Sequence, residues 1–435
     1  MSFWPPTGPG YSDNICNRSV AMKLLSHHLT GNANVKAAIY GFIQADLLAQ
    51  FHVTIAAVPG TLLDKLSALA PFAEIRRRRF DPVIKPYLHT WPWFEIGRIL
   101  SMKGGFTGLT NKETGRFYID AVVQNLDRHV AQSMGNAKRK GITGVYGYED
   151  TTLFAFRKAK ELGLECIYDL PIGYWRTAHS LLNEERERWP EWMATMPGLD
   201  DSADKLARKD EELRLADRIF VASSFTANTL KDFPGKIAPV QVVPYGFPTV
   251  SNEVRQYEDF NVKRPLRLLF VGSLSQRKGI ADLFEAVKSF GENVTLTLVG
   301  SKTTEDCPAL NDALTRHRWI PSLAHDAVLK LMREHDVLVF PSLFEGFGLV
   351  ITEAMSQGTP VITTDRTAGP DLIEHGKDGW LINAGSTLAL QQSIEDILIN
   401  PSTIQAIGKA AMNKARQRPW AIYGRELAAS VKKEI

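Results

Sequence analysis

Short apolar runs and segments with helical spacing alternate regularly along the second half of the 435-residue chain. The runs predict strands at 266–271, 294–299, 337–340, 361–364 and 380–382, and the spacing between them predicts helices at 280–290, 322–335 and in the stretch that ends at Gly358. Strands that alternate with helices in this way form a parallel sheet covered on both faces. Ligands of such sheets bind beyond the carboxyl ends of the strands, so a site is expected in the loops that follow them.

Two glutamates flank a glycine-rich turn at one of these strand ends. Glu345 and Glu353 stand in the sequence FEGFGLVITEAMSQGTP, residues 344–360. The glycine turn of this sequence lies between the strand at 337–340 and the helix that ends at Gly358. A strand, a glycine turn and a helix N-terminus form an anion site, because backbone N–H groups and the positive end of the helix dipole point outward. Two acids beside such a site indicate a ligand with phosphate and hydroxyl groups, as in a sugar nucleotide. Glu353 also fits an ordinary exposed helix position.

A second loop, which follows the strand at 266–271, carries two adjacent cations. Arg277 and Lys278 stand in the sequence GSLSQRKG, residues 272–279. Lys278 is a compact charge suited to a diphosphate, and Arg277 offers a fork of donors. Surface charge alone explains such a pair equally well. The glutamates that follow in the same sheet favour a diphosphate site.

These segments resemble family 4 glycosyltransferases, which are retaining enzymes of the GT-B fold. Residues 345–353 are similar to the E-x7-E signature of that family, and residues 271–279 resemble its phosphate-binding GxLxxxKG loop. Further likeness lies in residues 353–362, 216–224 and 241–246, and in the tail from Trp420, which resembles a helix that crosses back onto the first domain. The resemblance covers about 216–380 with good specificity and the upstream chain only vaguely.

The resemblance implies an α/β fold with two Rossmann-like domains that face each other across a cleft. The expected boundaries are 1–248 for the acceptor-side domain, 249–415 for the donor-binding domain, and 416–435 for a C-terminal helix packed back on the first domain. The stretch 246–258 lacks periodicity and is the candidate hinge.

The resemblance also implies roles by position. Lys278 would neutralise the donor diphosphate, Glu345 would bind hydroxyls of the donor sugar, and Glu353 would hold the ribose hydroxyls. Gly348 and Leu349 would offer backbone N–H groups. The implied catalytic residues are Lys278, Glu345, Arg277 and Asp169, and the implied donor-binding residues are Gly272, Ser273, Gly348, Leu349 and Glu353. Neither a metal nor a cofactor is expected, because in the family the leaving phosphate is thought to take the proton of the acceptor.

Two positions depart from the family pattern. Ser273 stands where arginine is common, so either Arg277 supplies the second cation or the site lacks one. Asp169 falls near a position that often carries histidine. Its carboxylate either orients an acceptor hydroxyl or caps the following turn.

The expected function is that of a hexosyl-type retaining glycosyltransferase. It would move a sugar from a nucleotide-diphosphate sugar to a hydroxyl of a glycan or lipid-linked acceptor, in the synthesis of surface polysaccharide of the bacterial type. The alternatives are a nucleotide-sugar epimerase on the same fold and an inactive sugar-binding scaffold.

Composition and charge narrow the remaining classes. A net charge of +3 gives no argument for a nucleic-acid partner. Cys16, Cys166 and Cys307 are far apart and indicate a reducing cytosol. No signal peptide or membrane-spanning run is recognised, so a cytoplasmic protein is expected. Residues 200–204 read as a solvated acidic turn without metal.

Positive charge gathers in residues 71–140, which hold 13 Lys/Arg against 6 Asp/Glu. The excess begins at residues 76–79, Arg76 to Arg79, and is followed by the aromatic stretch 91–94. Such a segment either holds the protein on the inner face of a membrane or forms a solvated strand edge followed by a buried aromatic corner.

The first half is expected to be α/β but less regular. The predicted helices are 14–29 and 151–162, the predicted strands are 35–40, 52–58, 166–170, 219–222 and 240–243, and residues 183–212 are predicted as exposed helix and loop. Residues 1–4 are too short for a convincing first strand.

Overall fold

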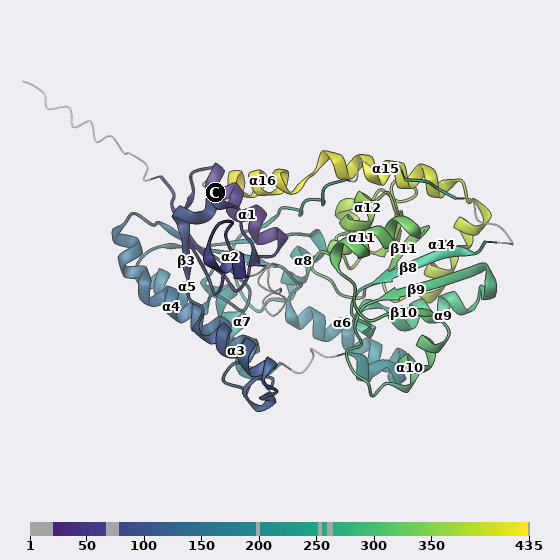
Figure 1. The fold of residues 1–435 in the computed structure, drawn as a ribbon, viewed down its shortest axis with the longest axis horizontal. Coiled ribbons are helices and arrows are strands. Elements are labelled where there is room, and N and C mark those ends of the chain that lie inside the picture. Colours follow the sequence, from purple (N-terminus) through teal and green to yellow (C-terminus); the bar gives the residue numbers. More distant parts are fainter. Residues whose placement is uncertain (1–20, 67–77, 197–200, 251–254, 259–263, 434–435) are drawn as a thin grey trace, which may run out of the picture.

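The computed structural model describes residues 21–66, 78–196, 201–250, 255–258 and 264–433. Within this range the chain forms two sheets, one of seven strands and one of six, in which every ladder pairs parallel strands. Each sheet belongs to one half of an elongated molecule (Figure 1). The expected α/β architecture of two Rossmann-like domains is confirmed.

The first sheet has the strand order β3-β2-β1-β4-β5-β6-β7. Its strands are β1 (Leu24–His28), β2 (Leu48–Val53), β3 (Leu88–Thr90), β4 (Gly144–Tyr148), β5 (Glu165–Leu170), β6 (Arg218–Val221) and β7 (Val240–Val242). Its helices are α1 (Ala33–Gln44), α2 (Leu62–Leu66), α3 (Trp93–Lys103), α4 (Ile119–Arg139), α5 (Leu153–Glu161), α6 (Trp175–Arg188), α7 (Ala203–Leu215) and α8 (Ser224–Thr229). The central strands are buried on both faces, as expected for a parallel sheet between helix layers.

The second sheet has the strand order β10-β9-β8-β11-β12-β13. Its strands are β8 (Leu266–Val271), β9 (Val294–Val299), β10 (Arg318–Ile320), β11 (Val337–Phe340), β12 (Val361–Thr364) and β13 (Trp380–Ile382). Its helices are α9 (Ile280–Lys288), α10 (Pro308–Thr315), α11 (His325–Glu334), α12 (Leu349–Ser356), α13 (Gly369–Leu372), α14 (Thr387–Ile399) and α15 (Thr403–Gln417). The order reverses between β8 and β11, and such a switch point opens a crevice at the carboxyl ends of the two strands.

Two predicted elements at the start of the chain are wrong. The strand β1 occupies residues predicted as a helix over 14–29, and the helix α1 contains residues predicted as a strand over 35–40. β1 is central and buried on both faces, so its sequence shows no alternation. The apolar run of α1 is buried beneath another helix, which hides its helical period. Of the strand predicted at 52–58 only the end of β2 is present, and residues 1–4 lie outside the described range.

The C-terminal helix α16 (Trp420–Lys432) returns to the first domain and packs along α1, as predicted (Figure 1). A Cβ atom at Gly41 would overlap the carbonyl oxygen of Gly424, so the two helices touch through their backbones. The chain connects the two domains twice, near Phe247 and near Arg418. The two connections lie side by side, because the N–H of Phe247 donates to the carbonyl oxygen of Arg418 at 2.8 Å. The domain boundaries at 248 and 415 remain predictions.

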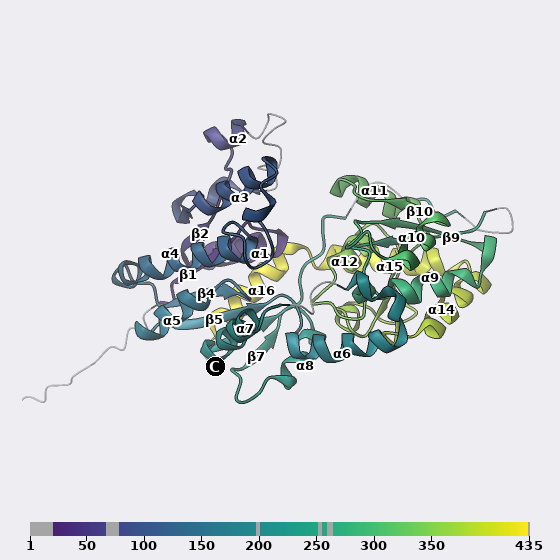
Figure 2. The same ribbon diagram turned by 90° about the horizontal axis from the view of Figure 1, so that it is seen from below.

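The segment that follows β5 ties the first domain to the second (Figure 2). The 3-10 helix η4 (Pro190–Thr195) carries Trp192, whose ring stacks on Phe284 with centroids 5.6 Å apart. The backbone N–H of Gln276 donates to the Thr195 hydroxyl at 2.9 Å, and its side chain donates to the Glu185 carboxylate at 2.9 Å. Glu185 and Trp192 are buried, so the prediction of an exposed 183–212 segment is wrong at these contacts.

Candidate functional site

Two loops of the second domain meet at the switch point of its sheet. β8 and β11 are neighbours, so the loops that follow them leave the sheet at the same edge. The 3-10 helix η6 (Gln276–Lys278) lies in the first loop, and Glu345 lies in the second. The Lys278 ammonium forms an ion pair with the Glu345 carboxylate. Arg277 donates from Nη1 to the carbonyl oxygen of Phe344 at 2.7 Å and lies 3.3 Å from the Glu345 carboxylate.

The Lys278 ammonium is held in a largely dry position. Lys278 is 8% exposed, and its Nζ atom lies 4.9 Å from the centre of the Phe340 ring. Burial lowers the pKa of Lys278, and the charge of Glu345 opposes that shift. A cation in such surroundings attracts an anion strongly, because little water screens its charge. The position suits an anionic ligand group.

A cavity of about 410 Å³ opens over this ion pair between the two domains. From the second domain it is lined by Val271, Gly272, Lys278, Phe340, Glu345, Phe347, Gly348, Leu349 and Val350, and from the first by Asn32, Asn34, Pro171 and Tyr245. Five predicted site residues therefore share one cavity. Ser273, Arg277, Glu353 and Asp169 lie outside its lining.

The N-terminus of α12 opens into the cavity. Gly348 precedes the helix with a φ of 85°, a conformation that favours glycine. A Cβ atom at Gly348 would lie 2.9 Å from the Phe340 ring, so space also requires a glycine. The start of the helix places its partial positive charge beside the cavity.

Glu353 lies one turn further along α12. Its side chain is mostly buried, with Oε1 at 3.8 Å from Nδ1 of His325, so the reading as an exposed helix position is wrong. Burial raises the pKa of Glu353, and His325 partly opposes that shift. Binding of ribose by Glu353 stays a prediction.

The first domain holds the glutamate loop in place. Ser223 and Thr226 both donate to the carbonyl oxygen of Gly346, at 2.6 and 3.0 Å. A Cβ atom at Gly346 would overlap the carbonyl oxygen of Pro171, which shows how closely the domains approach. The loop that carries Glu345 is therefore fixed by contacts from both domains.

Asp169 lies near the end of β5 and is buried. Its Oδ2 atom accepts a hydrogen bond from the Tyr146 hydroxyl at 2.6 Å, instead of capping the turn that follows. Burial raises the pKa of Asp169 to about 7, and the bond from Tyr146 opposes that shift. Its charge in turn helps to raise the pKa of Tyr245, although burial is the larger cause. Asp169 therefore lies outside the cavity lining, whereas Tyr245 is part of that lining.

The loop after β1 and the first turn of α1 contribute residues that were not predicted. Asn32 and Asn34 line the cavity, and Asn34 donates from Nδ2 to the Tyr245 hydroxyl at 3.2 Å. His28 shapes the loop, because its Nδ1 atom accepts from the N–H groups of Thr30 and Gly31 at 3.2 and 3.1 Å. The TGN turn after an apolar run was the available signal, but the run was taken for a helix.

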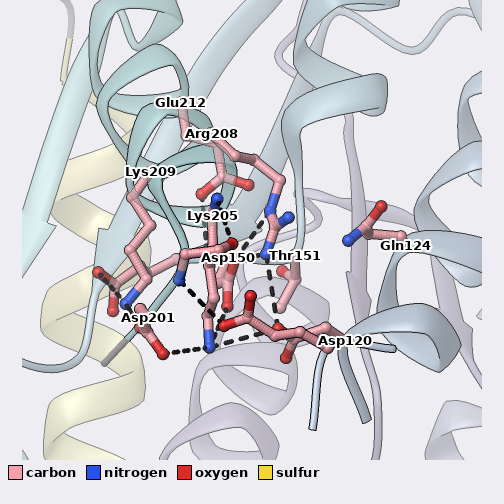
Figure 3. A network of polar contacts seen from close by, with 12 residues as sticks. Asp120, Gln124, Asp150, Thr151, Asp201, Lys205, Arg208, Lys209 and Glu212 are labelled. Atoms are coloured by element: carbon pink, nitrogen blue, oxygen red, sulfur yellow. Dashed lines mark hydrogen bonds and ion pairs between the residues drawn. The ribbon is translucent and has the colours of Figure 1, made fainter. Parts of the chain in front are cut away.

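A second polar network lies at the carboxyl end of β4 in the first domain (Figure 3). Arg208 donates from Nε to Asp150 at 2.9 Å, and Lys205 lies 3.1 Å from Asp201 and 3.3 Å from Asp120. Glu212 accepts from the N–H groups of residues 150 and 152 at 2.7 and 2.9 Å. The network fixes the loop after β4. Asp201 is mostly buried within it, so the solvated-turn reading is wrong at that residue.

The described part of the basic segment differs from the solvated strand edge and buried aromatic corner that formed one of its two expected readings. Arg78 is buried in an ion pair with Glu95, and Arg79 lies 3.2 Å from Asp64, so the solvated-edge reading is wrong at Arg78. Arg76 and Arg77 lie outside the described residues. Trp93 is exposed, so the buried aromatic corner is wrong there too.

Three further observations concern the cysteines, metal-ligating side chains and membrane-spanning segments. Cys166 and Cys307 are free and buried, while Cys16 lies outside the described range. Where the structure describes the chain, no three or more His, Cys, Asp or Glu side chains are grouped to hold a metal ion. The same part of the chain contains no helix whose length and apolar character suffice to cross a bilayer.

Comparison with known proteins concerns mainly the second half of the chain. Residues 252–414 match the family "Glycosyl transferases group 1". Glycogen synthase of Mycobacterium tuberculosis is 30% identical over 34% of this chain and 38% of its own length. The capsular polysaccharide biosynthesis glycosyltransferase CapM of Staphylococcus aureus is 32% identical over 32% of this chain and 38% of its own. The chain thus spans about two fifths of the length of these relatives.

Two solved structures match nearly the whole chain. Anabaena HepE in complex with UDP has a TM-score of 0.59 at 16% identity, covering 94% of this chain and 99% of its own. An Escherichia coli structure titled trehalose-6-phosphate bound with UDP-2-fluoro glucose has a TM-score of 0.59 at 10% identity, covering 95% and 99%. At these identities the likeness concerns the fold.

Proposed function

Residues 252–414 carry a group 1 glycosyl transferase domain within a GT-B fold, and from that premise we propose that the chain is a retaining glycosyltransferase. It moves a sugar from a nucleotide-diphosphate sugar to a hydroxyl of a glycan or lipid-linked acceptor. The observation that carries the proposal is the Lys278–Glu345 pair in a cavity that both domains line.

The proposed donor lies with its diphosphate at Lys278 and the N-terminus of α12. Lys278 stabilises the charge that develops on the departing diphosphate, and Arg277 fixes the glutamate loop through the carbonyl oxygen of Phe344. Glu345 accepts hydrogen bonds from hydroxyls of the sugar. Glu353 takes the ribose hydroxyls from its position on α12.

In the proposed reaction the bond between the anomeric carbon and the diphosphate oxygen breaks. The acceptor oxygen forms the new bond on the same face, and its proton passes to the departing phosphate. The protein then contributes chiefly positioning and charge stabilisation. Asn34 and Tyr245 stand where the first domain would meet the sugar, and Asn34 donates a hydrogen bond to the Tyr245 hydroxyl.

The relatives guide the choice of substrates to test. HepE structures contain UDP and UDP-glucose, which supports a uridine sugar as the first donor. CapM and the amylovoran biosynthesis glycosyltransferase AmsK of Erwinia amylovora are named for surface polysaccharides, which supports an acceptor of that kind.

The test is product analysis by NMR after incubation with nucleotide sugars and a panel of glycan and lipid-linked acceptors. We expect acceptor-dependent release of nucleoside diphosphate and a product that keeps the anomeric configuration of the donor. Consumption of donor without acceptor and with an altered sugar would instead indicate an epimerase. Binding of donor without turnover on any acceptor would favour a sugar-binding scaffold.

A further inference from the structure

Exposed apolar side chains gather on one part of the first domain. Among the described residues ten large apolar side chains are exposed, and eight of these lie between residues 63 and 109. The eight are Leu63, Val83, Trp93, Ile96, Leu100, Met102, Phe106 and Leu109. The other two, Leu388 and Ile399, lie on α14 of the second domain. Eight exposed apolar side chains within one stretch of the first domain indicate an interaction surface.

The helix α3 at the centre of this surface is inverted relative to an ordinary amphipathic helix. Trp93, Ile96 and Leu100 share one helical face, and that face points outward, with Trp93 64% and Leu100 63% exposed. The opposite face buries Glu95, which is 0% exposed.

Glu95 is kept in that position by two guanidinium groups. Arg98 donates to its carboxylate from Nε and Nη2 at 2.8 and 2.7 Å, and Arg78 pairs with it from the preceding segment. Burial of a carboxylate is costly unless it is paired. The paired charges therefore fix the helix with its apolar side outward.

Exposed cations outnumber exposed acids in the stretch of chain that carries the apolar residues. Within residues 78–118 the exposed Lys and Arg residues are Arg79, Lys85, Lys103, Lys112 and Arg116, and the exposed acids are Asp81 and Glu113. An exposed apolar helix face that carries a tryptophan, in a stretch with an excess of exposed cations, fits the interface of an anionic bilayer. A second copy of the chain fits less well, because a symmetric contact would bring the excess positive charge of the two copies together.

We propose that the exposed face of α3, formed by Trp93, Ile96 and Leu100, docks together with Phe106 of the following loop on the surface of an anionic lipid bilayer. Figure 2 shows α2 and α3 projecting from the rest of the first domain, and the exposed fractions of Trp93 and Leu100 place their side chains at the surface of that projection. α3 follows β3 at the carboxyl edge of the sheet, the edge whose other loops line the cavity. Docking would bring that edge of the sheet near lipid-linked acceptors. This consequence rests on the proposed function, whereas the docking proposal itself does not depend on that function.

The test is co-sedimentation of the full chain with vesicles of phosphatidylcholine, with and without phosphatidylglycerol, in the absence of any nucleotide sugar. Wild type should bind the phosphatidylglycerol vesicles, and W93S/L100S should bind them at least about tenfold more weakly. The matched control L388S/I399S removes equally exposed apolar side chains from the second domain and should bind as wild type does. K85E/R116E should weaken binding only to the anionic vesicles.

Circular dichroism and thermal midpoints establish that each variant is folded; if W93S/L100S is not, I96S/F106S replaces it. Failure of wild type to bind phosphatidylglycerol vesicles would overturn the proposal. So would equal binding by W93S/L100S and wild type. A wild-type dimer in sedimentation equilibrium that W93S/L100S dissociates, without vesicle binding, would assign the face to a second copy of the chain and also overturn it.

Discussion

The Lys278 ammonium and the Glu345 carboxylate form an ion pair that joins the loops after β8 and β11 at the switch point of the second sheet. The pair lies in a cavity that residues of the first domain also line. Burial lowers the pKa of Lys278, and the charge of Glu345 opposes that shift. In the free protein Glu345 therefore stabilises the charged form of Lys278. A bound diphosphate would give Lys278 a second anionic partner.

Removal of either member of this pair should abolish sugar transfer while the chain stays folded. We expect Lys278→Ala and Glu345→Ala to lower kcat/KM by a factor of about 10² or more, because charge stabilisation in a dry site has effects of that size. Lys288→Ala removes an exposed lysine from the end of α9 and should leave kcat/KM unchanged. Steady-state kinetics measure the effect. Near-wild-type turnover in either variant would contradict the assignment of this cavity as the active site.

Asp169→Asn should make stability less dependent on pH. Burial raises the pKa of Asp169 from 3.8 to about 7, so between these values the folded state holds a proton that the unfolded state has lost. Wild type therefore loses stability as the pH rises through this window, whereas asparagine cannot ionise. Above it, Asp169→Asn should gain on the order of 1 kcal/mol or more relative to wild type.

Thermal denaturation on both sides of the window checks this prediction. The difference between Asp169→Asn and wild type should be small in mild acid and should grow above neutral pH. A difference that does not change with pH would mean that Asp169 ionises as an ordinary exposed carboxyl group does.

Gly348→Ala should cost more stability than Gly60→Ala, although their φ values are 85° and 84°. Both substitutions force alanine into a left-handed conformation, at about 1–2 kcal/mol. Gly60 has open space around it, whereas a Cβ atom at Gly348 would press on the Phe340 ring. Chemical denaturation separates the two costs. Donor affinity should fall only for Gly348→Ala, and equal effects of the two variants would show that the α12 N-terminus tolerates a side chain.

Gly41→Ala should loosen the return of α16 onto the first domain. A Cβ atom at Gly41 would overlap the backbone of Gly424, so the helices must separate, at about 1–3 kcal/mol. Gly135→Ala places the same change in α4, where no neighbour lies within 4 Å, and should stabilise the chain by about 0.5–1 kcal/mol. Denaturation curves give the change in the free energy of unfolding for each variant. A change of the same sign for both variants would contradict the close contact between the two helices.

The second domain could be predicted well from the sequence because its strands are short apolar runs closed by glycines. Gly272 and Gly300 each end a predicted strand in the structure and have φ values near 150°. In the structure β8 pairs with β11, a strand order that the alternation does not specify, and this pairing brings Lys278 to Glu345. The short strand β10 was not predicted, since it pairs with β9 at an edge and carries little apolar signal.

The first domain could be predicted less well for two physical reasons. β1 and α1 are buried on both sides, so neither shows the period that distinguishes a strand from a helix. As a result the turn that brings Asn32 to the cavity was missed. At α3 one of the two readings of the sequence was a buried aromatic corner, but Glu95 is the residue buried, with Arg78 and Arg98, and Trp93 is exposed.

The most direct test of the donor site is titration calorimetry of UDP-, GDP-, ADP- and dTDP-sugars with wild type, Lys278→Ala and Glu345→Ala. We expect one nucleotide class to bind wild type, Lys278→Ala to lose affinity for both the sugar nucleotide and the free nucleoside diphosphate, and Glu345→Ala to lose affinity mainly for the sugar nucleotide. Binding of the same nucleotide sugar with unchanged affinity to all three proteins would contradict the assignment of this cavity as the donor site.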